Sequence, residues 1–321
     1  MSARSTTARA RPELERQGAH VESMQRRRLM LGMTEVLAER GLEDTSVGRI
    51  CKRAGVSRRT FYGLFDGRDE CLLAAFEDAI ERLTEPVTVA WRSQRAWRDR
   101  VAAALAVLLE RFDAEPELAR LCVVETLKAA PPVLERRARI LSALVAAVEQ
   151  GRTQARGGSE PPPLAGQGVV GGVLSIVHTR LVEAAPGAPQ PPLSELYGAL
   201  MAMIVHPYLG AAAARRESER EAPEPSGTAP GVRDPFSGLS LRFTYRTARV
   251  LATIAAEPGA SNRIVATSAG IADDGQTSRL LARLSRVGLI ENNSNGHQRG
   301  EANAWRLTER GEAVQAALAG R

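Results

Sequence analysis

The sequence is poor in lysine, in aromatic residues and in cysteine. Lys52 and Lys128 are the only lysines among 43 basic residues, so arginine supplies nearly all of the positive charge. Aromatic residues make up 4% of the chain, whereas the hydrophobic fraction of 44% suffices for ordinary cores. The three cysteines, Cys51, Cys71 and Cys122, are far apart and form no C-x-x-C pair. This spacing argues against a zinc ribbon or a disulfide framework and predicts small buried thiols in a reducing cytoplasm.

Long apolar runs and catalytic motifs are also missing. The first twenty residues are polar and arginine-rich, which is not the pattern of a secretory signal peptide. The most apolar stretch, residues 169–182, contains His178 and Arg180 and is shorter than the ~20 residues needed to span a bilayer. No G-x-S-x-G elbow, phosphate-binding glycine loop or H-E-x-x-H motif occurs, and the histidines are scattered. We therefore expect a cytoplasmic protein with no membrane contact, no enzymatic activity, and no metal or other cofactor.

The charge is divided unevenly along the chain. Residues 1–68 contain 14 basic and 8 acidic side chains, residues 69–238 contain 18 and 22, and residues 239–321 contain 11 and 7. Two basic ends around an acidic middle indicate nucleic-acid-binding modules on either side of a central body. Chance clustering is the alternative explanation on charge alone.

Helical periodicity dominates the N-terminal region. Residues 1–20 lack periodicity and are predicted to form a disordered basic arm. Apolar residues then recur at helical spacing over residues 22–40. Three shorter helices follow, for which Thr45 or Ser46, Ser57 and Asp66 can serve as N-caps. Four short helices in about sixty residues predict a compact helical domain.

The rest of the chain divides into a helical body, a linker and a smaller C-terminal block. Residues 86–214 show helical spacing without strand alternation, so this body is predicted to be all-α. Residues 215–238 are rich in charged residues, Pro, Gly and Ser, which is a linker composition. Residues 239–321 predict three helices, two strands at 289–291 and 304–307, and a final helix. The fold class is therefore mainly all-α, with a small β-hairpin in a winged helix-turn-helix at the C-terminus.

The segment TSVGRICKRAGVSRRTFYGLF, residues 45–65, has the residue order that a helix-turn-helix requires. Gly55 permits a tight turn through a left-handed conformation, and Val56 fills the core beneath that turn. The following helix presents polar and basic side chains at its N-terminal end, where recognition helices meet base edges and phosphates. Over residues 22–83 the sequence resembles the helix-turn-helix domain of TetR-family regulators.

This resemblance implies that residues 21–85 bind DNA and that the body dimerises through its last two helices and holds a small molecule. The expected DNA contacts are Thr45, Ser46, Ser57, Arg58, Arg59, Thr60, Tyr62 and Arg68. Two positions depart from the family pattern: Arg68 stands where lysine is frequent, and Gly63 lacks a polar side chain that often contacts DNA. The candidate pocket residues are Trp97, Phe112, Leu144 and His178, although an aromatic residue on an amphipathic helix usually belongs to the core.

The C-terminal block resembles a MarR-type winged helix. Leucines at positions 280, 281 and 284 are expected to point inward and to leave the leading end of the third helix exposed, while residues 292–303 would form the wing. The expected DNA contacts of this domain are Gln276, Thr277, Ser278, Arg279, His297 and Arg299. Winged helices also serve as dimerisation or protein-binding modules, so both roles stay open.

Together these patterns predict a homodimeric, sequence-specific transcriptional regulator of the bacterial nucleoid. The family resemblance implies a repressor that binds double-stranded DNA at a palindromic operator and is released by an apolar small molecule. Gly171 and Gly172 in an apolar helix, with Met201 and Met203 in the last one, suit close packing against a second copy of the chain. The alternative is a ligand-independent architectural or co-regulatory protein that bridges DNA sites with both modules.

Overall fold

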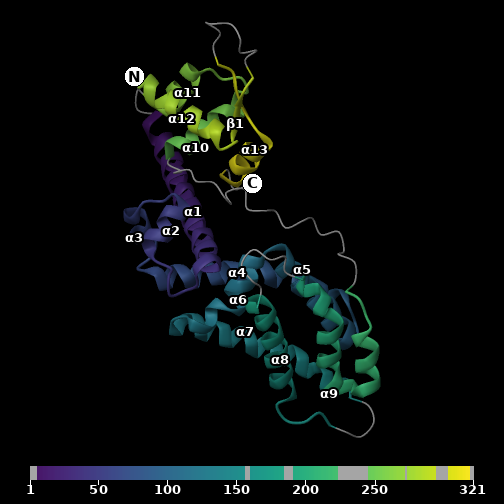
Figure 1. Cartoon of the computed structure of the whole chain (residues 1–321). Helices are drawn as coiled ribbons and strands as arrows, with labels where there is room; N and C mark the ends of the chain where they lie inside the picture. Colours follow the sequence, from purple (N-terminus) through teal and green to yellow (C-terminus); the bar gives the residue numbers. More distant parts are fainter. Residues whose placement is uncertain are drawn as a thin grey trace. The chain divides into compact units, whose positions relative to one another are not determined.

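The computed structural model describes residues 6–155, 160–183, 191–222, 245–271, 273–293 and 303–318. This part of the chain is mainly helical and contains a two-stranded antiparallel sheet (Figure 1). Its contacts group residues 1–32, 46–68 and 232–321 into one compact unit, and residues 33–45 and 69–231 into a second.

The N-terminal helices are α1 (Thr6–Arg40), α2 (Val47–Ala54) and α3 (Arg58–Leu64). The prediction of a disordered arm over residues 1–20 is wrong from Thr6 onward, because α1 already begins there. Alanine, arginine and glutamate, which favour helix, make up eight of the fifteen residues from Thr6 to His20.

The second unit contains the helical body, and its elements follow one another without an intervening strand in the described residues (Figure 1). They are α4 (Arg68–Ser93), α5 (Trp97–Ala114), α6 (Pro116–Val123), η1 (Glu125–Lys128), α7 (Pro131–Glu149), η2 (Gln150–Gln154), α8 (Ala165–Glu183), η3 (Leu193–Leu196) and α9 (Tyr197–Ser218). The prediction of an all-α body is confirmed, and Pro116 and Pro131 begin helices, where proline's missing N–H costs nothing.

Helix α9 is two helical segments joined by a sharp bend. Gly210 has φ 80° and ψ 175°, a conformation open almost only to glycine, and Pro207 lies one turn before it. The second segment folds back along the first. Its end reaches Gly198 so closely that a Cβ there would lie within 3.0 Å of the carbonyl oxygens of Glu217, Ser218 and Arg220. Glu217 is buried there and forms ion pairs with Arg98 and Arg220.

The bend also bears on membrane insertion. Residues Leu193–Ser218 are long and apolar enough, by length and composition alone, to cross a membrane. The bend at Gly210 divides this stretch into two segments. Each is shorter than the ~20 residues of a spanning helix. This stretch therefore forms two packed helical segments of the body and not one continuous spanning helix.

The C-terminal domain comprises α10 (Tyr245–Ala256), α11 (Asn262–Ala269), α12 (Asp274–Arg286), β1 (Ile290–Asn292), β2 (Trp305–Leu307) and α13 (Glu309–Leu318). The predicted order of three helices, two strands and a helix is confirmed. In the sheet, Ile290 is paired with Leu307 and Asn292 with Trp305. The indole N–H of Trp305 donates to Asn262 Oδ1 over 2.7 Å, which ties the sheet to the start of α11.

The cysteines are free thiols, as the sequence predicts. Cys51 and Cys71 are buried and Cys122 is half-buried. Burial raises the pKa of Cys51, and it raises the pKa of Cys122 to about 12. Both thiols are therefore protonated and unreactive near neutral pH.

Candidate nucleic-acid interface

The turn between α2 and α3 has the geometry that the sequence predicts. Gly55 adopts φ 63° and ψ 32°, and its N–H donates to the carbonyls of Cys51 and Lys52 at the end of α2. Ser57 caps α3 by accepting from the Thr60 N–H over 3.0 Å. Val56 is buried beneath the turn. These local interactions fix the direction of α3.

Helix α3 presents one apolar and one polar side. Phe61 is fully buried and packs edge-to-face against the ring of its neighbour Tyr62. Tyr62 itself is 60% exposed, although it is a large aromatic residue. Arg58 and Arg59 are exposed at the N-terminal end of the same helix. An exposed tyrosine with two arginines at a helix N-terminus suits contact with phosphates and base edges.

Three further expected DNA-contacting residues are less exposed to solvent. Ser57 and Thr60 are half-buried and bond to each other through their hydroxyl oxygens, 2.8 Å apart. Arg68, the first residue of α4, is also half-buried. Thr60 therefore reaches DNA only if the hydrogen bond to Ser57 is shared or exchanged.

Thr45 does not belong to this surface. Its side chain is buried and its hydroxyl donates to the Gly41 carbonyl over 2.8 Å. Ser46 is the N-cap of α2, accepts from the Arg49 N–H and is exposed. The expectation that both residues face DNA is therefore wrong for Thr45. Only one residue of the pair can be the N-cap of α2, and because Ser46 is that residue, Thr45 turns inward.

Helix α2 contributes basic residues that the sequence reasoning missed. Arg49 and Lys52 are exposed on it, and Arg53 is half-buried. The guanidinium of Arg58 extends from α3 over the first turn of α2, since a Cβ at Gly48 would lie 2.6 Å from its terminal nitrogen. Residues 46–68 contain six basic side chains and one acidic one, Asp66. That excess of positive charge on two adjoining short helices was visible in the sequence.

The leading end of α12 is the second candidate surface. Gln276, Ser278 and Arg279 are exposed, as predicted. The prediction for Thr277 is wrong: this residue is buried, since it lies one helical turn before the buried Leu281 and so faces the core. The exposed Asp273 caps the helix, and its carboxylate accepts from the Gly275 and Gln276 N–H groups. A negative charge there weakens the attraction of this end for phosphate.

Two more arginines extend this second surface toward the end of α12. Arg283 and Arg286 are exposed, and the sequence reasoning passed over both. His297 and Arg299, the expected wing contacts, lie outside the described residues.

The four candidate pocket residues do not form one site. Trp97 and Phe112 are buried at opposite ends of α5, and fifteen residues at 1.5 Å each separate them by about 22 Å. Leu144 on α7 is exposed and His178 on α8 is half-buried. A compact small molecule does not reach both ends of α5, so the four residues do not line one small pocket.

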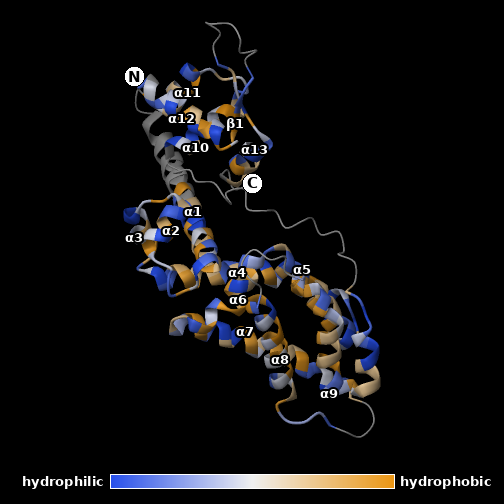
Figure 2. Cartoon of the chain, viewed as in Figure 1, coloured by the Kyte–Doolittle hydropathy of each residue, from blue (hydrophilic) through white to orange (hydrophobic). Residues whose placement is uncertain are grey.

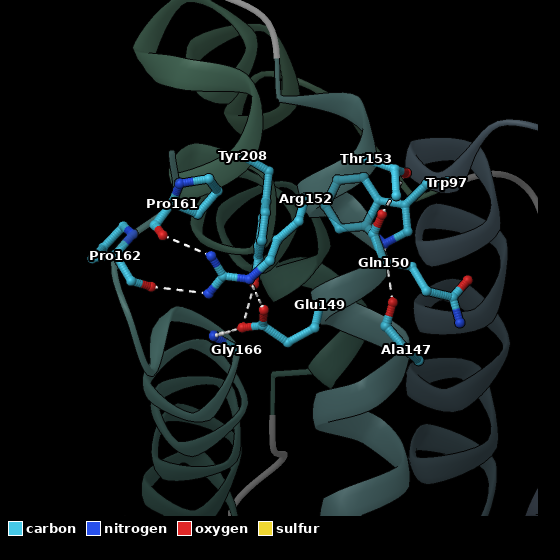
Figure 3. A network of polar contacts seen from close by, with 10 residues as sticks. All are labelled: Trp97, Ala147, Glu149, Gln150, Arg152, Thr153, Pro161, Pro162, Gly166 and Tyr208. Atoms are coloured by element: carbon cyan, nitrogen blue, oxygen red, sulfur yellow. Dashed lines mark hydrogen bonds and ion pairs between the residues drawn. The ribbon is translucent and has the colours of Figure 1, made fainter. Parts of the chain in front are cut away.

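Trp97 instead belongs to a packed polar junction (Figure 3). Its indole N–H donates to the Ala147 carbonyl over 3.0 Å, and its ring packs edge-to-face on Tyr208. A Cβ at Gly151 would lie 2.6 Å from the same ring. The indole therefore fills its space completely and leaves no room for a ligand on that side.

The carboxylate of Glu149 is the centre of this junction (Figure 3). It accepts from Arg152, from the Gly166 N–H at the start of α8 and from the Tyr208 hydroxyl. The hydrogen bond from Arg152 is the main reason why the pKa of Glu149 is lowered. Burial raises the pKa of Tyr208 to about 12. The network joins α7, α8 and α9, and its role is to hold these helices together.

Residues 33–75 match the family model described as bacterial regulatory proteins, tetR family. This part of the chain is therefore similar to the helix-turn-helix of tetR-family regulators. The HTH-type transcriptional regulator BetI of Brucella abortus (strain 2308) is 30% identical over 87 residues, which cover 27% of this chain and 44% of the relative. BetI of Brucella canis is 29% identical over a stretch of the same length. The chain thus spans less than half the length of these curated relatives, which are named as transcriptional regulators.

Solved structures of regulators resemble about half of the chain. The fatty acid degradation regulator FadR from Bacillus halodurans has a TM-score of 0.49 at 17% identity, covering 56% of this chain and 94% of its own. FadR from Bacillus subtilis, solved in complex with stearoyl-CoA, has a TM-score of 0.47 at 19% identity, covering 56% and 96%. Among the described residues no group of three or more His, Cys, Asp or Glu side chains is placed to hold a metal ion.

Proposed function

We propose that this protein is a cytoplasmic, homodimeric transcriptional regulator that binds a palindromic operator through α3. The observation that carries the proposal is the exposed end of α3, where Arg58, Arg59 and Tyr62 stand beside the basic residues of α2 in a TetR-type helix-turn-helix. The family implies repression more often than activation. Selection of genomic fragments by the purified protein, followed by footprinting, tests whether it recognises a defined palindrome.

The dimer is proposed to form through the exposed faces of α8 and α9. Gly168, Gly171, Ser175 and Thr179 repeat on one exposed side of α8 and carry no charge. Exposed large apolar residues flank this stripe: Leu164, Ile176 and Val182. Helix α9 contains many apolar residues (Figure 2), and the small residues Ala199, Ala211 and Ala212 are exposed on it. Small residues beside exposed apolar ones allow two helix pairs to approach closely, and burying them from water stabilises the association.

Base reading and phosphate binding are expected to separate between α3 and α2. Arg59→Ala removes an exposed arginine at the leading end of α3, so operator affinity should fall by about 1–3 kcal/mol while unrelated DNA is bound almost as before. Lys52→Ala removes a charge on α2 and should weaken binding to all DNA alike. Titrations at several salt concentrations should give a slope shallower by about 0.9 per lost phosphate contact for Lys52→Ala.

The two variants serve as controls for each other, since each removes one exposed positive charge. Equal losses on operator and on unrelated DNA for both would contradict the assignment of α3 as the base-reading helix.

Release by an apolar small molecule is proposed for the body, and ligand-independent DNA bridging is the second candidate. The C-terminal domain favours bridging, because its elements have the order of a winged helix and α12 exposes three arginines. A thermal-shift screen separates the two functions. Stabilisation by apolar metabolites, together with loss of operator binding, supports a ligand-released repressor. A protein that no such compound stabilises, and that joins two labelled duplexes in one complex, supports bridging.

A further inference from the structure

The core of the C-terminal domain includes a residue from the other end of the chain. Met24 of α1 is 5% exposed and belongs to the same apolar cluster as Val250, Leu284 and Val314. Val21 and Leu31, also on α1, are partly buried against this cluster. Positions 21, 24 and 31 are three and seven residues apart and therefore lie on one side of a helix. The C-terminal domain is thus seated on a defined face of α1.

The helix-turn-helix is held by the same stretch of α1. The guanidinium of Arg26 donates to the carbonyl of Leu64, the last residue of α3, over 3.0 Å. It also lies 4.4 Å from the centroid of the Phe65 ring. Gly32 allows α2 to approach closely, since a Cβ there would lie 3.2 Å from Ala54 and from the Ile50 carbonyl oxygen.

These two sets of contacts are only a few residues apart. Arg26 lies two residues after Met24, and Gly32 lies eight residues after it, about 12 Å along the helix. Met24 and Arg26 therefore lie within one turn of the same helix. Arg26 is hydrogen-bonded to the end of α3, which is the proposed base-reading helix.

We propose that the C-terminal domain regulates the DNA-binding helix-turn-helix by docking on α1. In the docked state the domain covers Met24, orders the stretch 21–32 and so keeps Arg26 on the end of α3. In the undocked state an apolar methionine is left in water, the stretch loosens and α3 loses its support. This role rests on the proposed function, and it holds whether or not the C-terminal domain itself touches DNA.

The docking contact is tested by a pair of adjacent lysine substitutions in the full-length protein. Met24→Lys introduces a charge into the apolar cluster, whereas Ser23→Lys adds the same charge at an exposed neighbouring position. Hydrogen exchange is followed without DNA at two backbone amides. The Phe61 N–H donates to the Ser57 carbonyl at the start of α3, and the Phe65 N–H donates to the Phe61 carbonyl at its end. We expect Met24→Lys to raise exchange at both amides and Ser23→Lys to leave it unchanged.

Operator affinity gives the second readout. On the selected palindrome Met24→Lys should bind about 5- to 150-fold more weakly than Ser23→Lys, the range of typical coupling between two sites. Because both variants carry the added charge, attraction to phosphate does not account for a difference. Val21→Lys, at the edge of the cluster, should lower operator affinity by an intermediate factor. This milder variant keeps the test valid if Met24→Lys fails to fold.

The outcomes separate the coupling from the proposed function. If Met24→Lys and Ser23→Lys give the same exchange at α3 and the same affinity, the proposal is wrong and the contact only stabilises the C-terminal domain. If the wild-type protein selects no DNA while exchange at α3 still rises in Met24→Lys, the coupling is supported and the proposed function fails.

Discussion

Gly171→Arg is expected to convert the protein from a dimer into monomers and to abolish binding to the palindrome at nanomolar concentrations. Gly171 is exposed on α8, and a Cβ there would meet no described atom within 4 Å, so arginine fits the isolated protomer. In a dimer the same position would bury an unpaired charge, which is strongly unfavourable. Joining two helix-turn-helix domains in one dimer raises avidity 10²- to 10⁴-fold. The monomer loses this gain, so operator affinity should fall by roughly 100-fold or more.

The neighbouring glycine shows why the choice of position matters. A Cβ at Gly172 would lie 3.3 Å from Met203 of α9 in the same chain, so arginine there would disturb the protomer as well. Thr84→Arg, on the exposed side of α4, is a suitable control for the added charge. Light scattering at micromolar concentration measures the oligomeric state. A Gly171→Arg protein that remains dimeric would rule out α8 as the interface.

Gly311→Ala is expected to unfold the C-terminal domain while leaving the body intact. A Cβ at Gly311 would overlap the carbonyl oxygen of Leu289, a fully buried residue just before β1. The backbone cannot move aside easily, because that carbonyl also accepts from the Thr308 N–H over 3.1 Å. Inserting a methyl group into such a contact costs about 3 kcal/mol or more, a large part of the stability of a small domain.

Limited proteolysis and hydrogen exchange over residues 245–318 measure this loss directly. Glu312→Ala changes the next residue, which is exposed, and should leave the domain as protected as in the wild type. A Gly311→Ala protein with normal protection would rule out the close approach of α13 to the Leu289 carbonyl.

Local signals predicted the helix-turn-helix well. The left-handed turn at Gly55, the cap at Ser57 and the buried Phe61 each follow from a residue type at a fixed offset, and the structure has all three. Errors arose where two adjacent residues are chemically equivalent. Thr45 and Ser46 can both cap α2, and only backbone geometry decides that the serine does so while the threonine turns inward.

Tertiary features were not accessible in the same way. The four pocket candidates were chosen for residue type, but the length of α5 separates Trp97 from Phe112. Met24 reads as one more apolar residue of α1, and no periodicity links it to Val250 and Val314 more than two hundred residues later. Such long-range partners depend on how the domains pack, which a single sequence does not encode in any local pattern.

The reversal of α9 at Gly210 makes the architecture of the body dependent on one glycine. A side chain at this position would add about 1–3 kcal/mol of backbone strain and so favour a straighter α9, in which Ala213 and Ala214 would leave the surfaces that now bury them. The same surfaces on a second copy would then be the nearest matching partners, which is the starting point of a domain swap. A single substitution at Gly210 is therefore expected to redirect the packing of α9 toward a second copy while every residue of α2 and α3 stays the same.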